Sequence, residues 1–349
     1  MNKFAAVSDR DAFMSDSIRK LIKYMLSVAF AAVLLYFSFR DVEWKDFIAG
    51  LRDCRWEFVA ISMAAGVVAF WLRGLRWRRL LLPIDDSISR ITTFNGINIG
   101  NISNFVIPRI GEFVRCGVIT KRSLPSDPEA PEHKKASYDK VLGTVVLERS
   151  WELLVMLLML AVVVVAGFRR FGNFFIEQIW TPMSGNLSFS LWWVVLIAVV
   201  FLVSGVFLVW RFRTVSRVCA GIWNVIAGIW QGMASCMKME QKWLFFAYTA
   251  LIWLMYWFMA ASTVWAAPFL DELDLVDALF LSLVGGLGFA VPVPGGIGAF
   301  HFVISLALSS IYGVPVELGV VYATLSHTSQ AITQIVFGAG SYAYEALKK

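Results

Sequence analysis

Residues 275–311 read LVDALFLSLVGGLGFAVPVPGGIGAFHFVISLALSSI, two apolar segments separated by the sequence PVPGG at Pro292–Gly296. Each segment, 275–291 and 297–311, is shorter than the ~20 residues that a helix needs to cross a bilayer. Proline stops a helix, and a break in backbone hydrogen bonding is prohibitively costly against lipid. The break must therefore lie within protein or beside a water-filled cavity. The pattern predicts a helical membrane protein with a re-entrant hairpin whose tip is the Pro/Gly turn.

A second broken segment, residues 91–116, reads ITTFNGINIGNISNFVIPRIGEFVRC. It is apolar enough for membrane depth, yet it carries four asparagines: Asn95, Asn98, Asn101 and Asn104. Side chains spaced three residues apart do not stay on one face of a helix, so these asparagines suit a segment that is surrounded by protein or water. We expect a re-entrant hairpin here that enters from the cytoplasm, whereas the hairpin at 275–311 enters from the other side.

The two segments share the spacing Phe-x-x-Pro-x-x-Gly, which begins at Phe105 and again at Phe289, a separation of 184 residues. The same separation relates the apolar span that begins near Phe58 to the one that begins near Lys242. The charges of the flanking loops make these two spans run in opposite directions. This combination is typical of an inverted-topology repeat, whose halves we expect at about 22–165 and 191–344.

The composition agrees with a polytopic membrane protein. Of the 349 residues 58% are hydrophobic and 16% charged, and the mean hydropathy is +0.68. Soluble domains are about 45–50% apolar and about 25% charged, so an ordinary soluble enzyme, a disordered chain and a secreted disulfide scaffold are excluded. The full spans that we expect are 21–39, 58–72 with its flanks, 143–165, 191–210, 243–266 and 316–344. The prediction is an all-α fold with one transmembrane domain, 1–349, with six crossings and two re-entrant hairpins. Eight full crossings fit as well.

The basic residues set the orientation, because they accumulate in cytoplasmic loops. The N-terminal tail, the segment 73–142 and Lys348–Lys349 are basic, whereas 267–277 carries only acidic charges. Both termini and the polar loop 121–142 are therefore predicted to be cytoplasmic. The basic block that follows the second span is assigned to the same side: Arg73, Arg76, Arg78, Arg79 and Arg90.

The net charge of +6 has the same explanation and comes with no nucleic-acid-binding motif. The four cysteines are scattered, which predicts neither a zinc site nor a disulfide framework. The sequence has no HExxH, GxSxG or GxxxxGK[ST] motif. We therefore expect no metal, no cofactor and no enzymatic activity.

The first candidate site group is Arg109, Glu112 and Arg115, at the break of the first hairpin. Charge at membrane depth costs ~2.5–3.5 kcal/mol even on insertion scales, so it usually faces a cavity or a partner. Two arginines can hold a phosphate with planar, bidentate geometry, and Glu112 can pair with one of them when the site is empty. The alternative is that the segment lies in the cytoplasmic interface and its arginines extend into water.

The second group is Glu148, Arg149 and Glu152. The two glutamates are four residues apart and share one helix face. They would balance the arginines of the first group or carry protons. Alternatively, they lie at the cytoplasmic start of their helix, where acidic residues are favoured.

The third group is the turn of the second hairpin, with Pro292, Pro294, Gly295, Gly296 and Gly298. The turn places the N-terminus of the next half-helix inside the protein, where unpaired backbone N–H groups favour an anion. Further polar candidates near the two breaks are Asn101, Asn104, His301 and His327. We interpret the two histidines first as groups that hydrogen-bond between helices and only second as ligands.

Three motifs in order resemble one known family: NFVIPRxGExxR at 104–115, ERxxE at 148–152 and PxPGGxG at 292–298. It is the flippase-like family of the lysylphosphatidylglycerol synthase transmembrane region, which includes the membrane half of bacterial multiple-peptide-resistance factors. The resemblance covers nearly the whole chain and implies an inner-membrane protein that translocates lipids. Its motif positions coincide with all three candidate groups. Many relatives have an acidic residue where this chain has His301, and the soluble aminoacyl-transferase domain does not occur in this sequence.

Together these observations predict a flippase in the bacterial inner membrane that moves an anionic, phosphate-containing lipid between leaflets. The expected partners are membrane lipids, and a homo-oligomer is left open. The alternative is an intramembrane transferase for a polyprenyl or glycerolipid phosphate, which would need a base or metal-binding carboxylates. A third alternative is a membrane scaffold that transports nothing.

Overall fold

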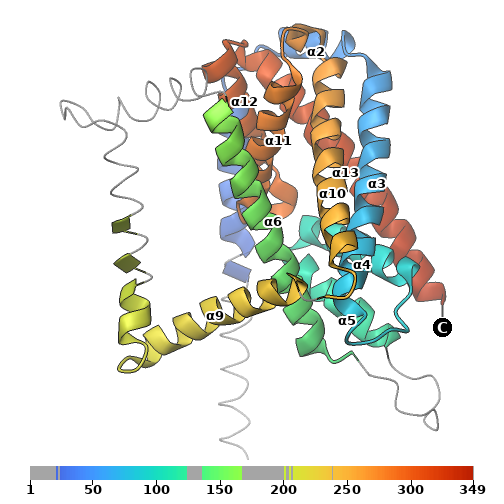
Figure 1. Ribbon diagram of the computed structural model, residues 1–349. Coiled ribbons are helices and arrows are strands. Elements are labelled where there is room, and N and C mark those ends of the chain that lie inside the picture. Colours follow the sequence, from blue (N-terminus) through green and yellow to red (C-terminus); the bar gives the residue numbers. More distant parts are fainter. Residues whose placement is uncertain are drawn as a thin grey trace, which may run out of the picture.

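The computed structural model describes residues 21–123, 136–166 and 200–348, apart from 23, 202, 203, 206 and 238 (Figure 1). The regular secondary structure of these residues is entirely helical, as the sequence predicts. The N-terminal tail 1–20, most of the polar loop 121–142, the loop 167–190 and more than half of the predicted span 191–210 lie outside the described residues. The span predicted to begin at Gly143 begins earlier, at Tyr138, as helix α6 (Tyr138–Ala166).

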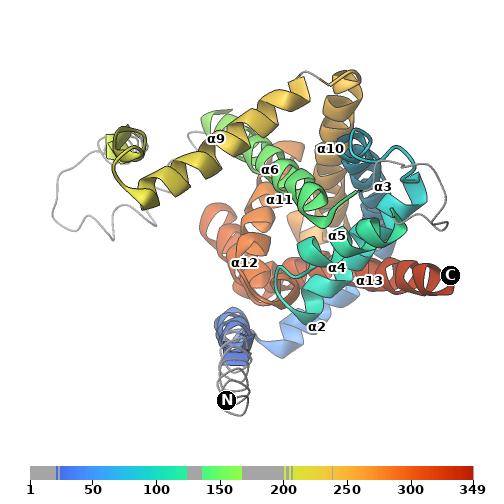
Figure 2. The ribbon, with the colours of Figure 1, turned by 90° about the horizontal axis from the view of Figure 1, so that it is seen from below.

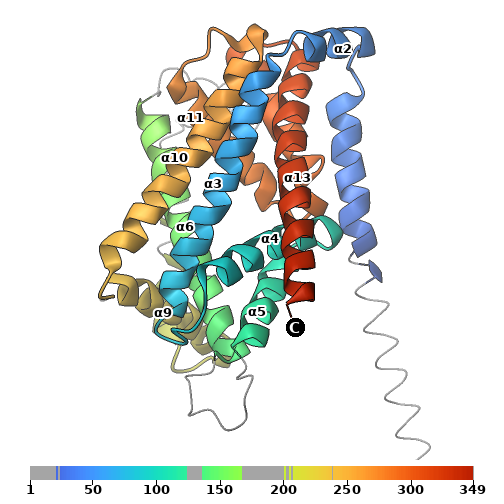
Figure 3. The same ribbon diagram turned by 90° about the vertical axis from the view of Figure 1, so that its right-hand side faces the viewer.

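Two long apolar helices pack side by side along one side of the bundle, α3 (Trp56–Leu81) and α10 (Lys242–Ala266) (Figures 1 and 3). Together with the segment Pro294–Tyr312 they are long and apolar enough to cross a bilayer. The second segment of the hairpin at 275–311 is therefore longer than predicted from the sequence, because the helical turn at Pro294–Gly296 extends it. The helix Tyr24–Phe39 and α2 (Trp44–Arg52) form a further apolar pair that is bent by 87°. The chain is therefore a helical membrane protein.

The course of α3 corrects one prediction from the sequence. The second span does not end at Leu72 before a solvated basic block, because α3 continues without interruption to Leu81. Arg73 is 7% exposed and Arg76 is fully buried, so neither belongs to a cytoplasmic loop. The helix can continue past Leu72 because its polar side chains find partners on α6. Acidic side chains of α6 form ion pairs with Arg76. The indole N–H of Trp77 donates a hydrogen bond to the hydroxyl of Thr144, also on α6, at 2.9 Å.

Each of the two broken segments forms a helical hairpin. Helices α4 (Arg90–Val106) and α5 (Gly111–Arg122) pack together, and so do α11 (Leu275–Ala290) and α12 (Ala299–Tyr312). In Figure 1 the first hairpin lies in the end of the bundle where α3 ends, and the second lies in the end where α3 begins. Helix α13 (Val316–Leu347) runs along both hairpins and contacts α4 and α12. Figure 2 shows that α9 (Arg217–Met237) extends away from this bundle.

A close helix approach holds the first hairpin together. A Cβ atom at Gly111 would lie 2.0 Å from the carbonyl oxygen of Gly100, so only glycine fits there. The side-chain oxygen of Asn104 accepts a hydrogen bond from the backbone N–H of Gly111 at 2.7 Å. This bond satisfies one of the backbone donors that a helix leaves unpaired at its start.

The tips of the two hairpins meet inside the molecule. The guanidinium of Arg109 donates a hydrogen bond to the carbonyl oxygen of Ala290, at the end of α11. Arg109 has a positive φ of 65°. Among the described residues, every other residue with a positive φ is a glycine. Gly295 has a φ of 58°, and a Cβ atom there would lie 2.4 Å from the ring of Phe105. The two breaks in the sequence are therefore in direct contact.

Candidate functional site

A closed ring of three arginines and three glutamates joins α3, α5 and α6. Taken in order around the ring, the ion pairs are Arg76–Glu148 at 3.1 Å, Glu148–Arg115 at 2.8 Å, Arg115–Glu112 at 2.7 Å, Glu112–Arg149 at 2.8 Å, Arg149–Glu152 at 2.5 Å and Glu152–Arg76 at 2.5 Å. Every carboxylate oxygen contacts one guanidinium group of the ring. We call this set of six side chains the arginine–glutamate ring. Its formal charge is zero.

The ring is buried on one side and reaches a cavity on the other. The side chains of Arg76 and Glu148 are fully buried and that of Arg115 is 2% exposed, whereas that of Arg149 is 41% exposed. Taking several charges out of water is costly, and the cost is offset only when each charge finds good partners. The guanidinium of Arg115 also lies over the ring of Trp77 at 4.6 Å, a favourable cation–π contact.

A fourth arginine, Arg73, lies beside the ring without belonging to it. Its side chain is 9% exposed, and its Nε atom is 4.0 Å from Glu152. This Nε atom makes no hydrogen bond. Arg73 therefore adds one uncompensated positive charge to a neutral ring.

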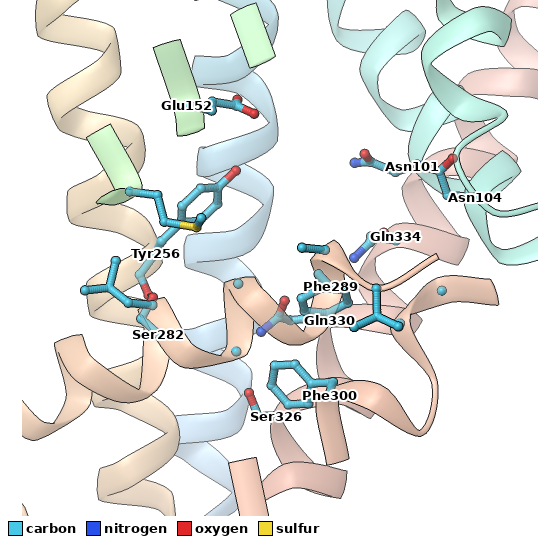
Figure 4. Close-up of a pocket in the computed structure, with 18 of the residues that line it drawn as sticks. Asn101, Asn104, Glu152, Tyr256, Ser282, Phe289, Phe300, Ser326, Gln330 and Gln334 are labelled. Atoms are coloured by element: carbon cyan, nitrogen blue, oxygen red, sulfur yellow. The ribbon is translucent and has the colours of Figure 1, made fainter. Parts of the chain in front are cut away.

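A cavity of about 610 Å³ opens between the ring and the two hairpin tips. Its polar lining residues from α3–α6 and the first tip are Arg73, Asn101, Asn104, Arg109, Glu112, Arg149 and Glu152. Figure 4 shows Glu152, Asn101 and Asn104 at one end of the cavity, and Phe289 and Phe300 at the other. The cavity thus has a charged end and an uncharged end, where the aromatic rings lie beside Gln330 and Ser326 (Figure 4). This combination suits an amphipathic ligand.

Several candidates from the sequence lie at this cavity. The lining includes Arg109, Glu112, Arg149, Glu152, Asn101, Asn104, Pro292, Gly295 and Gly296. Arg115 and Glu148 lie behind it, in the inner part of the ring. Contrary to our expectation, Arg109 makes no ion pair with a glutamate of this ring and binds the backbone of α11 instead.

The remaining candidates do not line the cavity: Pro294, Gly298, His301 and His327. Gly298 packs against the helix Tyr24–Phe39, because a Cβ atom there would lie 2.4 Å from the carbonyl oxygen of Ala31. His327 on α13 is hydrogen-bonded through Nε2 to the carbonyl oxygen of Gly295 at 2.9 Å. The ring of His301 lies 4.9 Å from that of His327. These residues shape and support the second tip.

Sequence reasoning missed Arg73 and Arg76 as site residues. Their signal is periodicity, because Ala69, Arg73, Arg76 and Leu80 lie at helical spacing and all are buried. Polar residues of α10, α11 and α13 that line the cavity were also not assigned to the site: Tyr256, Ser282, Ser326, Gln330 and Gln334. Within the described residues, no group of three or more His, Cys, Asp or Glu side chains is placed to hold a metal ion.

The fold and the site define a helical membrane protein with an internal, charge-lined cavity. The chain belongs to the family described as the lysylphosphatidylglycerol synthase TM region, whose model matches residues 24–338. The resemblance noted from the three motifs is thereby confirmed, and it ties the chain to a lipid-related function in the membrane. Comparison with curated proteins finds no match, and comparison with solved structures finds none either.

Proposed function

We propose that the protein moves an anionic, phosphate-containing lipid between the leaflets of the bacterial inner membrane. The observation that carries this proposal is the charge of the cavity lining, where three arginines, Arg73, Arg109 and Arg149, face two glutamates, Glu112 and Glu152. An excess of positive charge at membrane depth is costly unless a ligand or water compensates it. A negatively charged phosphate that crosses the hydrocarbon core likewise needs a positive group to compensate its charge.

The shape of the cavity supports a lipid as the ligand. The charged end can receive a headgroup, and the guanidinium fork matches phosphate geometry. The apolar side chains of the uncharged end, Leu281, Phe289, Phe300 and Ile304, can contact the start of an acyl chain. The cavity is lined from both hairpin tips, so a relative movement of the tips would change access to it.

We further propose that the two halves are an inverted repeat. A shift of 184 residues carries α4, 90–106, onto 274–290, next to the bounds of α11, 275–290. The same shift carries α3, 56–81, onto 240–265, next to the bounds of α10, 242–266. This agreement supports two re-entrant hairpins that enter from opposite sides, with both termini in the cytoplasm. Alternating exposure would then come from one half rocking against the other.

The ion pairing of the glutamates favours transport without a chemical step over the transferase alternative. A transferase acting on a polyprenyl or glycerolipid phosphate needs a carboxylate that can act as a base or bind a metal. The glutamates nearest the cavity are Glu112, Glu148 and Glu152, and all of them are ion-paired with arginines. We therefore propose that the protein itself catalyses no covalent step.

The test is a leaflet-resolved lipid assay with the purified full chain in proteoliposomes. The panel contains phosphatidylglycerol, phosphatidylethanolamine and phosphate-free diacylglycerol analogues with identical acyl chains. We expect protein-dependent movement of phosphatidylglycerol and a much slower effect on phosphatidylethanolamine. Diacylglycerol crosses unaided and sets the ceiling of the assay. Rates equal to protein-free liposomes for every headgroup would contradict the proposal, and a covalently altered lipid product would favour the transferase.

A further inference from the structure

Among the arginines that line the cavity, Arg73 differs from the others in its charge balance. In the arginine–glutamate ring, three guanidinium groups and three carboxylates neutralise one another. Outside the ring, the cavity lining retains two arginines, Arg73 and Arg109. Arg109 is exposed and donates to the carbonyl oxygen of Ala290, so part of its hydrogen-bonding capacity is used. Arg73 has no comparable partner.

Arg73 is a buried cation outside the neutral ring, and its charge balance sets it apart from the ring arginines, which also have nitrogen atoms without a hydrogen bond. Its only ionic contact within the described residues is the 4.0 Å approach of Nε to Glu152, a carboxylate that already pairs with two ring arginines. Its Nε atom makes no hydrogen bond. A buried donor without an acceptor and a buried charge without a counter-charge are both costly. The cost of such a group falls when an anion or cavity water compensates it.

A second unpartnered donor lies next to Arg73. The side-chain amide nitrogen of Asn101, on α4, is buried and makes no hydrogen bond. Asn101 and Arg73 both line the main cavity, and both line a small void of about 10 Å³ behind it. A cation and a neutral donor from two different helices therefore face the same space.

We propose that Arg73, assisted by Asn101, is the residue that binds the anion in this cavity, and that the ligand atom is an anionic phosphate oxygen. The arginine–glutamate ring is then a neutral frame that fixes α3, α5 and α6 around this group. The inference rests on the proposed function for its ligand class and assigns the recognition step to a residue outside the three family motifs.

This assignment predicts opposite effects for two neighbouring arginines on α3. In Arg73→Gln, binding is lost while folding is kept, because an uncompensated charge has been removed. In Arg76→Gln, the ring is opened and Glu148 and Glu152 lose a partner, so the melting temperature falls. Arg73→Lys keeps the charge but loses the planar fork, so it should bind with intermediate affinity. Arg79→Gln, on the same helix but outside the cavity, is the matched control.

The experiment measures binding of short-chain phosphatidylglycerol to the purified full chain in detergent, together with the melting temperature of each variant. Diacylglycerol of the same chain length serves as the phosphate-free probe. We expect Arg73→Gln to weaken phosphatidylglycerol binding by about tenfold to a hundredfold, the range for a lost charge-assisted hydrogen bond. Arg79→Gln should bind like the wild type. Wild-type affinity in a folded Arg73→Gln variant would overturn the inference.

Inorganic phosphate, as a competitor, distinguishes the two sources of the ligand. If it does not displace phosphatidylglycerol, the lipid is the ligand. If it does so in the wild type but not in Arg73→Gln, the site takes free phosphate, and the assignment of Arg73 still holds. The proposed function is tested separately. If phosphatidylglycerol binds through Arg73 but does not move between leaflets, the proposed function is contradicted and the role of Arg73 stands. If Arg73→Gln moves phosphatidylglycerol at the wild-type rate, the role of Arg73 is contradicted and the proposed function stands.

Discussion

Glu148 has a central position among the charged residues. It is fully buried and bridges Arg76 on α3 and Arg115 on α5, whereas its own backbone belongs to α6. Three helices therefore depend on one carboxylate. At this depth a charge is tolerated because its partners are fixed by the surrounding helices, and the loss of one partner leaves the others uncompensated.

Glu148→Gln should therefore destabilise the protein strongly. It leaves two buried guanidinium groups with one counter-charge fewer, and breaking a buried pair in this way costs about 3–5 kcal/mol. The free energy of unfolding in a fixed detergent is the measurement. Glu57→Gln, at an exposed position at the start of α3, is the control and should change it by less than about 0.5 kcal/mol. Equal effects of the two variants would show that the ring does not hold the helices together.

The contact between α4 and α5 depends on a single glycine. A Cβ atom at Gly111 would lie within 2.7 Å of both the backbone of Gly100 and the side chain of Asn104, and backbone cannot move aside cheaply. Gly111→Ala should therefore lower the melting temperature and disrupt the hairpin. Gly117→Ala, in the same helix, has nothing within 4 Å and should be neutral or stabilising by up to about 1 kcal/mol, the alanine preference of a helix. The prediction fails if Gly111→Ala is as stable as Gly117→Ala.

The contact between the two hairpin tips can be tested in a similar way. Gly295→Ala places a methyl group 2.4 Å from the Phe105 ring and also requires alanine at a φ of 58°. Gly313→Ala requires a similar φ of 66° but has open space around it. The difference between the two variants therefore isolates the tip contact from backbone strain. We expect Gly295→Ala to slow lipid movement in proteoliposomes far more than Gly313→Ala, and similar rates would refute a functional role for this contact.

The sequence predicts the elements better than it predicts the site. The Pro/Gly breaks and the lengths of the apolar segments indicate both hairpins, since these are local properties of the chain. The burial of Arg73 and Arg76 is less well determined by the sequence, because helical periodicity is compatible with it but does not establish it. A basic block after an apolar span usually marks the cytoplasmic interface, and here its burial depends on glutamates about 75 residues away on α6. Likewise, the position of Gly298 depends on the first helix, which no local pattern specifies.

At the scale of the whole molecule, the inverted repeat predicts the sides from which the hairpins enter. Asp86 precedes α4 and Glu272 precedes α11, and both are exposed. In a Cys219→Ser background, in which the remaining cysteines are buried, we introduce Asp86→Cys or Glu272→Cys. A membrane-impermeant thiol reagent should label position 272 from outside and position 86 only after the inner face is exposed. Labelling of both positions from the same side would rule out the inverted repeat.

The central claim is that excess positive charge in the cavity carries an anionic lipid between leaflets. Its most direct test is the rate of phosphatidylglycerol movement in proteoliposomes for Arg109→Ala, Arg109→Lys and Arg149→Ala, at matched reconstitution density and with folding checked by melting temperature. Arg79→Ala, outside the cavity, is the control. We predict that both alanine variants fall to the protein-free rate, that lysine at 109 restores part of the activity and that the control keeps the wild-type rate. Arg149→Ala should also lower the melting temperature, because Glu112 and Glu152 lose a partner, whereas Arg109→Ala should not. Wild-type rates in folded Arg109→Ala and Arg149→Ala would contradict the account.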